Sequence, residues 1–249
     1  MKFIRLLAGS IYLLWISLIF VVSMFLVLPF IVLFTWIFKG KKAHRLGFLF
    51  LKIWSLTFSV LCLFIVRSRN REKIDNNHSY IFISNHNSYL DGVAMVISAP
   101  KVFKPLGKIE MLKVPVFKII YKRMVVMINR KDKQSRLRCI EELKIELASG
   151  LSILIFPEGT MNRTEEALAE FYDGAFRLAI ETQTAIVPVA IFNARNLMPR
   201  KNMLLVKPGR ISCVYGSPIE VTGLSETEIP KLKAKAHHIL ESMIRDGGY

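Results

Sequence analysis

A histidine and an aspartate five residues apart are the first residues in this chain that suggest chemistry. Residues 80–84 (YIFIS) predict a short buried strand that runs directly toward His86, and Asp91 follows at the start of an expected helix. Such a carboxylate can hold one ring nitrogen of the histidine while the other nitrogen takes a proton from a hydroxyl. A His-x4-Asp spacing is common by chance, so the pair indicates general-base chemistry only with support from elsewhere.

A second strand end carries a compact turn with an acid in it. Residues 151–156 (LSILIF) predict a buried strand, which leads into the five-residue sequence Phe-Pro-Glu-Gly-Thr at residues 156–160. The proline restricts the turn, and the glycine lets the backbone approach a ligand closely. Taken by itself, the sequence also fits a plain strand-to-loop turn with a solvated glutamate.

Together these motifs resemble the glycerophospholipid acyltransferase family, and most closely the 1-acylglycerol-3-phosphate (lysophosphatidate) acyltransferases. The family's motifs are present as Asn85, His86 and Asp91 (Asn-His-x4-Asp), as residues 156–160 (Phe-Pro-Glu-Gly-Thr) and as residues 187–189 (Val-Pro-Val). Their order and separation match the family, and the resemblance covers about residues 75–220. Two independent motifs at the correct spacing are far more specific than either alone.

The resemblance implies direct transfer of a fatty acyl group from acyl-CoA or acyl-carrier protein to the free hydroxyl of lysophosphatidate, which yields phosphatidate. It implies that His86 is the general base and that Asp91 orients it. The substrate-binding residues that it implies are Arg130, Glu158, Gly159 and Thr160. A planar guanidinium suits a phosphate, whereas the anionic Glu158 is expected to hold Arg130 or a lipid hydroxyl.

Three positions depart from the family's pattern. The glycine expected six residues before Arg130 is Met124 here, and two cations common in the family are replaced by Met161 and Tyr172, although Arg163 lies close by in the sequence. The acceptor is therefore the part of the assignment that the motifs constrain least.

Because the motifs leave the acceptor open, two alternatives remain. The same chemistry on another lysophospholipid or on an aminoacyl lipid fits the same motifs. A catalytically silent membrane-binding relative also fits the fold, but such a protein has no chemical need for intact His86, Asp91 and Glu158.

Other kinds of catalytic centre have no visible motif. The chain lacks the Gly-x-Ser-x-Gly elbow of serine hydrolases and the glycine patterns of nucleotide-binding loops. Its three cysteines (Cys62, Cys139 and Cys213) are scattered, without a Cys-x-x-Cys pair. We therefore expect no cofactor and no metal site.

The first third of the chain is apolar and basic. Residues 6–38 contain no charge, and a second apolar run covers residues 46–66. A spanning helix needs about 20 apolar residues, so the first run is long enough to enter a bilayer. Residues 1–73 carry 11 Lys and Arg against the single acid Glu72. This composition favours a membrane as partner over a nucleic acid.

The flanks of both apolar runs are basic, and basic flanks prefer the cytoplasmic side. Two helices that dip into the bilayer and return place every flank on one face, so we favour this monotopic arrangement over a two-span hairpin. The sequence thus predicts a protein on the cytoplasmic face of the cell membrane.

Alternating strand and helix patterns after residue 73 indicate an α/β fold with a mixed, mostly parallel sheet flanked by helices. We expect two parts, a membrane-embedded two-helix segment over residues 1–73 and an acyltransferase domain over residues 74–249. Within the second part, residues 101–138 are strongly basic. That stretch fits contact with an anionic leaflet, contact with the acyl donor, or simply a solvated basic surface.

Overall fold

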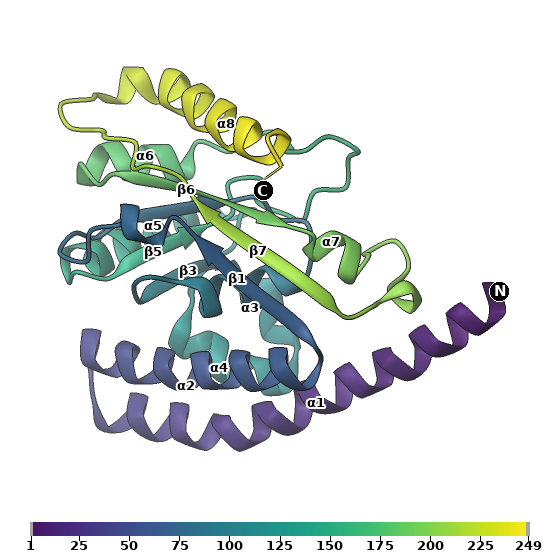
Figure 1. Cartoon of the computed structure of the whole chain (residues 1–249). Coiled ribbons are helices and arrows are strands. Elements are labelled where there is room, and N and C mark those ends of the chain that lie inside the picture. The colour runs from purple at the N-terminus through teal and green to yellow at the C-terminus, as the bar shows by residue number, and fades with distance from the viewer. Residues whose placement is uncertain (1, 248–249) are drawn as a thin grey trace.

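Strands and helices alternate along most of the chain (Figure 1), and the computed structural model describes residues 2–247. The strands are β1 (Phe64–Arg69), β2 (Ile81–Ser84), β3 (Phe103–Lys108), β4 (Val126–Ile128), β5 (Ser152–Ile155), β6 (Ile186–Phe192) and β7 (Gly209–Tyr215). The α-helices are α1 (Lys2–Ile37), α2 (Gly40–Leu61), α3 (Leu90–Ser98), α4 (Pro115–Met124), α5 (Lys133–Ala148), α6 (Gly174–Thr182), α7 (Ala194–Leu197) and α8 (Ile229–Arg245). Short 3-10 helices are η1 (Arg71–Lys73), η2 (Ile109–Lys113), η3 (Met203–Leu205) and η4 (Glu226–Glu228).

The strands form one sheet in the order β1-β7-β6-β2-β5-β3-β4. Strands β6, β2, β5, β3 and β4 run parallel to one another, whereas β7 is antiparallel to β6 and parallel to β1. The expected mixed, mostly parallel sheet is confirmed. Since parallel strands end at one edge, the segments that follow β2, β5, β3 and β4 come together there, where ligands of open α/β sheets usually bind.

Helices cover both faces of this sheet, so the core has two halves. Alternate residues of β2 point to opposite faces: Phe82 packs into the half that includes α2 and α3, and Ile81 and Ile83 pack into the half that includes α5, α6 and α8. Figure 1 shows α1 and α2 stacked outside one face and α6 and α8 outside the other. Strands buried on both faces explain the continuous apolar runs in the sequence.

The N-terminal helices α1 and α2 form a hairpin that lies along the domain. Near its start, α1 contacts η3, where a Cβ added to Gly9 would lie 2.8 Å from the carbonyl carbon of Leu204. Near its end, α1 meets α2 and α4: a Cβ on Gly47 would lie 2.7 Å from the sulfur of Met124 and 3.3 Å from a methyl of Thr35. Both ends of α1 therefore touch the same globular body.

Among the described residues, α1 is the one helix long and apolar enough to cross a membrane, over Leu6–Ile37. Most of its large apolar side chains are exposed, including Leu14, Leu18 and Leu26. Strand β1 lies inside the range 1–73 but pairs with β7, so the sheet begins before residue 74.

Two local elements were not predicted from the sequence. Helix η3 forms because the Asn202 side chain accepts a hydrogen bond from the N–H of Leu204 at 3.1 Å and starts a turn. The basic stretch also contains strand β3, whose sequence FKPLGK holds a proline and a glycine that disfavour strands.

We predict that Gly107→Ala destabilises the packing of α4 on β3. A Cβ at this position would lie 2.7 Å from the Cζ of Tyr121, whose ring is buried and cannot move freely. We expect a loss of about 1–3 kcal/mol in the free energy of unfolding, measured by denaturant titration in detergent. Gly92→Ala is the control, because nothing lies within 4 Å of its added Cβ and alanine favours a helix. Equal stability of both variants would contradict the close approach of Gly107 to the Tyr121 ring.

Candidate active site

The loop between β2 and α3 brings His86 and Asp91 together. The Asp91 carboxylate is 1% exposed and accepts three hydrogen bonds at Oδ2. The donors are Nδ1 of His86 at 2.9 Å and the backbone N–H groups of Asn87 and Ser88, both at 2.7 Å. Because an ionised carboxylate only accepts, the His86 ring must carry its proton on Nδ1 and keep a lone pair on Nε2. This arrangement can take a proton from a group placed at Nε2.

Asn85 fastens the same loop to the neighbouring strand β6. Its buried side-chain amide donates to the carbonyl of Ile191 at 2.9 Å, and its oxygen accepts from the N–H of Ile191 at 2.8 Å. The side chain thus continues the sheet's hydrogen bonding past the end of β2. His86 follows directly on a residue that cannot shift without breaking both bonds.

The Phe-Pro-Glu-Gly-Thr segment also contacts His86. The ring of Phe156 stacks on the imidazole with 4.2 Å between centroids and 20° between planes. The N–H of His86 donates to Oε1 of Glu158 at 2.7 Å, and the N–H of Asn162 donates to the carbonyl of His86 at 2.7 Å. The two sequence motifs are therefore one physical unit, since the second fixes the backbone and the ring plane of the first.

Glu158 has a structural position that the sequence did not predict. Its carboxylate is buried, and Oε2 accepts from the N–H of Ala169 at 2.8 Å while Oε1 accepts from His86. Burial raises the pKa of Glu158, although both backbone donors and the charge of His86 oppose the shift. Of the two partners expected for Glu158, Arg130 and a lipid hydroxyl, the first is replaced by backbone amides, which bind both carboxylate oxygens; a lipid hydroxyl stays a prediction.

Arg130 lies against the glycine of the motif instead. It follows β4, and a Cβ on Gly159 would lie 2.8 Å from the Cζ of Arg130. Gly159 has φ +70°, a conformation that side chains disfavour, so both space and backbone geometry require glycine here. The guanidinium also lies over the ring of Tyr172, 5.5 Å from its centroid. Tyr172, one of the departures from the family's pattern, therefore contacts Arg130 directly.

Met124, the second departure, packs away from the site. It ends α4, is 1% exposed, and contacts α2 at Gly47. The residue that replaces the family's glycine therefore anchors the helical hairpin to the domain.

Four cations gather at this edge of the sheet. Burial lowers the pKa of Lys108, the positive charges of Arg130, Arg163 and Arg200 lower it further, and the negative charge of Glu110 opposes the shift, so each of these groups lies near Lys108. Lys108 ends β3, and Arg200 donates to the carbonyl of Met161 at 3.2 Å. Neither Lys108 nor Arg200 was predicted as a site residue from the sequence; the end of a parallel strand was the available signal for Lys108.

The remaining site residue, Thr160, is exposed beside Gly159 at the end of the turn. Within residues 2–247, no group of three or more His, Cys, Asp or Glu side chains is placed to hold a metal ion. The site thus combines a proton acceptor at His86 with a cluster of cations that can bind an anion.

Known proteins share both the sequence pattern and the fold. An acyltransferase family model matches residues 65–192. The chloroplastic 1-acyl-sn-glycerol-3-phosphate acyltransferase LPAT1 of Arabidopsis thaliana is 27% identical over 193 residues, which cover 77% of this chain and 52% of that protein. The 1-acyl-sn-glycerol-3-phosphate acyltransferase alpha of Mus musculus is 26% identical, with 73% and 64% covered. The chain thus spans between about half and two thirds of the length of these curated relatives.

A solved structure agrees over nearly the whole chain. The crystal structure of the 1-acyl-sn-glycerophosphate (LPA) acyltransferase PlsC from Thermotoga maritima superposes with a TM-score of 0.77 at 21% identity. The match covers 99% of this chain and 97% of that chain. At this identity the likeness concerns the fold.

We predict that Glu158→Gln lowers the free energy of unfolding, because the amide presents a donor to one of two backbone N–H groups. The expected loss is about 1–3 kcal/mol. Since burial raises the pKa of Glu158, the wild-type side chain stabilises the fold most below about pH 4.3 and less as pH rises through its raised value. The deficit of the variant should therefore shrink with rising pH in denaturant titrations.

Glu165→Gln is the matched control for that series. Glu165 is exposed, and its hydrogen bond to Lys201 lowers its pKa, so its contribution appears as pH rises. The two variants should show opposite pH trends. If the loss of unfolding free energy in Glu158→Gln grows with pH, the raised pKa of the buried Glu158 carboxyl is contradicted.

Proposed function

The chain belongs to the acyltransferase family, and we propose that it transfers a fatty acyl group from acyl-CoA or acyl-carrier protein to the free hydroxyl of lysophosphatidate. The observation that carries the proposal is the His86–Asp91 pair beside the cation cluster of Lys108, Arg130, Arg163 and Arg200. The first supplies a base for a hydroxyl, and the second supplies a place for the acceptor's phosphate. The product is phosphatidate, a precursor in phospholipid synthesis.

In the proposed reaction, the acceptor hydroxyl gives its proton to Nε2 of His86 as its oxygen attacks the thioester carbonyl carbon. Asp91 stabilises the imidazolium, as the buried carboxylate does in a catalytic triad. The tetrahedral intermediate then collapses, the carbon–sulfur bond breaks, and the imidazolium returns the proton to the leaving thiolate. The ester bond of the product replaces the thioester bond of the donor.

Direct transfer is favoured because the cysteines outside the N-terminal hairpin are poor nucleophiles. Burial raises the pKa of Cys139 and of Cys213 to about 12, which keeps both as neutral thiols near neutral pH. Both side chains also lie in the core, away from substrate. His86 then acts on the acceptor rather than on a protein nucleophile.

The cation cluster favours an acceptor with an exposed phosphate. Arg130 is held in place by Gly159 and Tyr172, so its planar donors are already oriented. Glu158 contributes indirectly, since it fixes His86 and leaves Arg130 free for the ligand. Gly159 lies against Arg130, and the exposed Thr160 follows it in the chain.

The placement of α1 supports a monotopic protein. A helix whose two ends both contact the same domain cannot cross a bilayer completely, but its exposed apolar side can sink into one leaflet. We therefore propose that α1 and α2, within residues 1–73, hold the α/β domain on the cytoplasmic face of the membrane. A domain held at the membrane in this way is accessible to both a lipid acceptor and a water-soluble donor.

We predict that His86→Ala lowers kcat by a factor of about 10²–10⁴ with lysophosphatidate and acyl-CoA, because the base is removed. Membrane association should stay near wild type, whereas thermal stability should fall, because the buried Asp91 loses one of its three donors. His78→Ala is the control, since the His78 ring is exposed and bonds the exposed Asp75 at 2.8 Å. Turnover of His86→Ala at the control's rate would remove His86 as the base.

We predict that Arg130→Ala lowers kcat/KM for lysophosphatidate by about 10- to 100-fold, since charge-assisted hydrogen bonds contribute about 1.5–3 kcal/mol. The KM for acyl-CoA should not change. Arg138→Ala removes an exposed arginine of α5 that lies 3.9 Å from Asp132, so it controls for net charge. An unchanged acceptor KM, or a loss confined to the donor, would contradict the phosphate role.

A further inference from the structure

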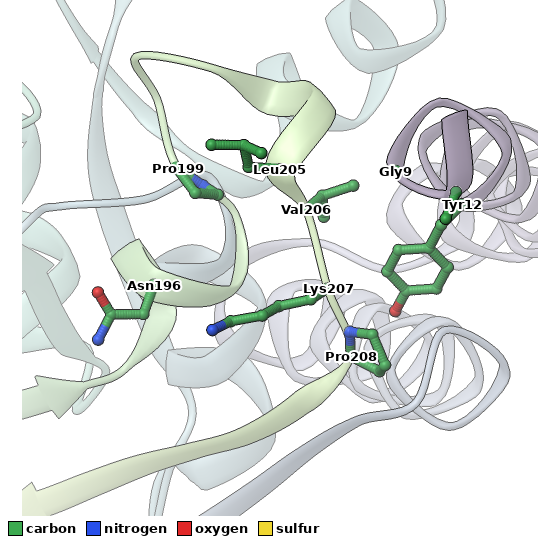
Figure 2. Close-up of a pocket in the computed structure, with 9 residues that line it drawn as sticks. Gly9, Tyr12, Asn196, Pro199, Leu205, Val206, Lys207 and Pro208 are labelled. Carbon is green, nitrogen blue, oxygen red and sulfur yellow. The ribbon is translucent and has the colours of Figure 1, made fainter. Parts of the chain in front are cut away.

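A cavity of about 440 Å³ lies between the first turns of α1 and the segment 196–208, apart from His86. Figure 2 shows Tyr12 and Gly9 of α1 on one side and the chain from Asn196 to Pro208 on the other. None of the proposed catalytic or phosphate-binding residues lines it. The cavity opens where the helix that we place in the leaflet meets the α/β domain.

Most of the cavity wall is apolar. Ala8 and Gly9 supply the helix side, and Leu205 and Val206 supply the opposite side. Leu7 and Ile11 of α1 and Leu204 of η3, which are close in the chain to residues that line the cavity, are exposed apolar side chains. They offer an acyl chain apolar surface on the same elements that form the cavity wall.

One end of the cavity carries an unpaired cation. Figure 2 shows the Lys207 side chain extended toward Asn196, and within the described residues neither side chain has a hydrogen-bond or ion-pair partner. The segment 195–210 contains five Lys and Arg and no acid. Two of them, Arg195 and Lys201, lie near Glu165, and Arg200 bonds the carbonyl of Met161. Lys207 is thus the cation that the cavity leaves for a ligand.

The cavity is separate from the His86 site but borders it. Pro199 lines the cavity, whereas its neighbour Met198 accepts a hydrogen bond from the Ser88 hydroxyl in the His86 loop at 3.5 Å. A ligand in the cavity therefore contacts the outer side of the segment whose inner side touches the catalytic loop.

We propose that this cavity binds one anionic phospholipid of the leaflet in which α1 lies. The lipid phosphate is held by Lys207 and Asn196, and the first part of an acyl chain packs on Ala8 and Val206. The volume suits a head group with its glycerol, and the apolar wall with one convergent cation matches the chemistry of such a lipid. The inference rests on the proposed membrane location of α1 and not on the transfer reaction.

The test measures lipid retention by the purified full chain in detergent, without substrate, using native mass spectrometry. The protein is titrated with dioleoyl phosphatidylglycerol and, separately, with dioleoyl phosphatidylcholine. We expect one tightly retained phosphatidylglycerol and at least about fivefold weaker retention of phosphatidylcholine. Equal retention of both lipids would overturn the proposal.

Two variants localise the binding. Lys207→Gln and Ala8→Phe, which fills the cavity, should each weaken phosphatidylglycerol retention at least about fivefold. Lys201→Gln removes an equal charge from the same segment outside the cavity and should retain the lipid as wild type does. Equal losses in Lys207→Gln and Lys201→Gln would show diffuse electrostatic attraction and overturn the site.

His86→Ala separates this inference from the proposed function. It should bind phosphatidylglycerol like wild type, whether or not it still transfers acyl groups. Retention of phosphatidate is measured last, because this lipid carries the same phosphate chemistry but is the proposed product. Lys207-dependent retention of phosphatidate with none of phosphatidylglycerol would overturn the assignment to a lipid of the leaflet.

Discussion

The structure around the candidate site depends on one buried carboxylate. Asp91 is almost fully removed from water, and such a charge is costly unless several donors surround it. The loop supplies two backbone N–H groups and the imidazole of His86, all at Oδ2. Satisfying Asp91 therefore fixes the path of residues 85–89 and the tautomer of His86 at once. In this sense the stability of the loop and the readiness of the base have a common cause.

The other motif residues hold that loop from outside. Asn85 ties it to β6, and Glu158 and Phe156 tie it to the end of β5. The glutamate, which the sequence suggested as a partner for Arg130, instead connects the two motifs through backbone amides. Arg130 is left to face Gly159 and Tyr172, with other cations nearby. The proton acceptor and the anion-binding cluster are therefore held in place by different residues, although both lie at one edge of the sheet.

The sequence predicted the strands at residues 80–84 and 151–156, which are continuously apolar, and the helix that begins near Asp91. It missed β1, since Phe64 and Val66 continue the apolar run of α2; the helix ends at Leu61, and the chain then turns at Leu63, whose φ is +53°. It also did not indicate β3, whose sequence holds a proline and a glycine, or η3, which the Asn202 side chain caps and which packs against α1. Local propensity is a weak guide where tertiary contacts decide.

In the site, too, the sequence did not predict contacts that depend on tertiary structure. The spacing of His86 and Asp91 predicted their contact because both lie within one loop and one helical turn. The contact of Glu158 with His86, and the gathering of Lys108 and Arg200 near Arg130, join segments far apart in the chain and depend on strand order. The departures from the family's pattern also became interpretable only in space, since Met124 anchors the hairpin and Tyr172 lies under Arg130.

The most direct measurement for this account is a competition between acceptors. The purified full chain receives acyl-CoA, or acyl-carrier protein in a parallel reaction, with equimolar lysophosphatidate and lysophosphatidylcholine, and mass spectrometry identifies the acylated products. The account predicts that phosphatidate is the main product, because only lysophosphatidate presents an uncovered phosphate to the cations around Arg130. Phosphatidylcholine in equal or greater amount would contradict it.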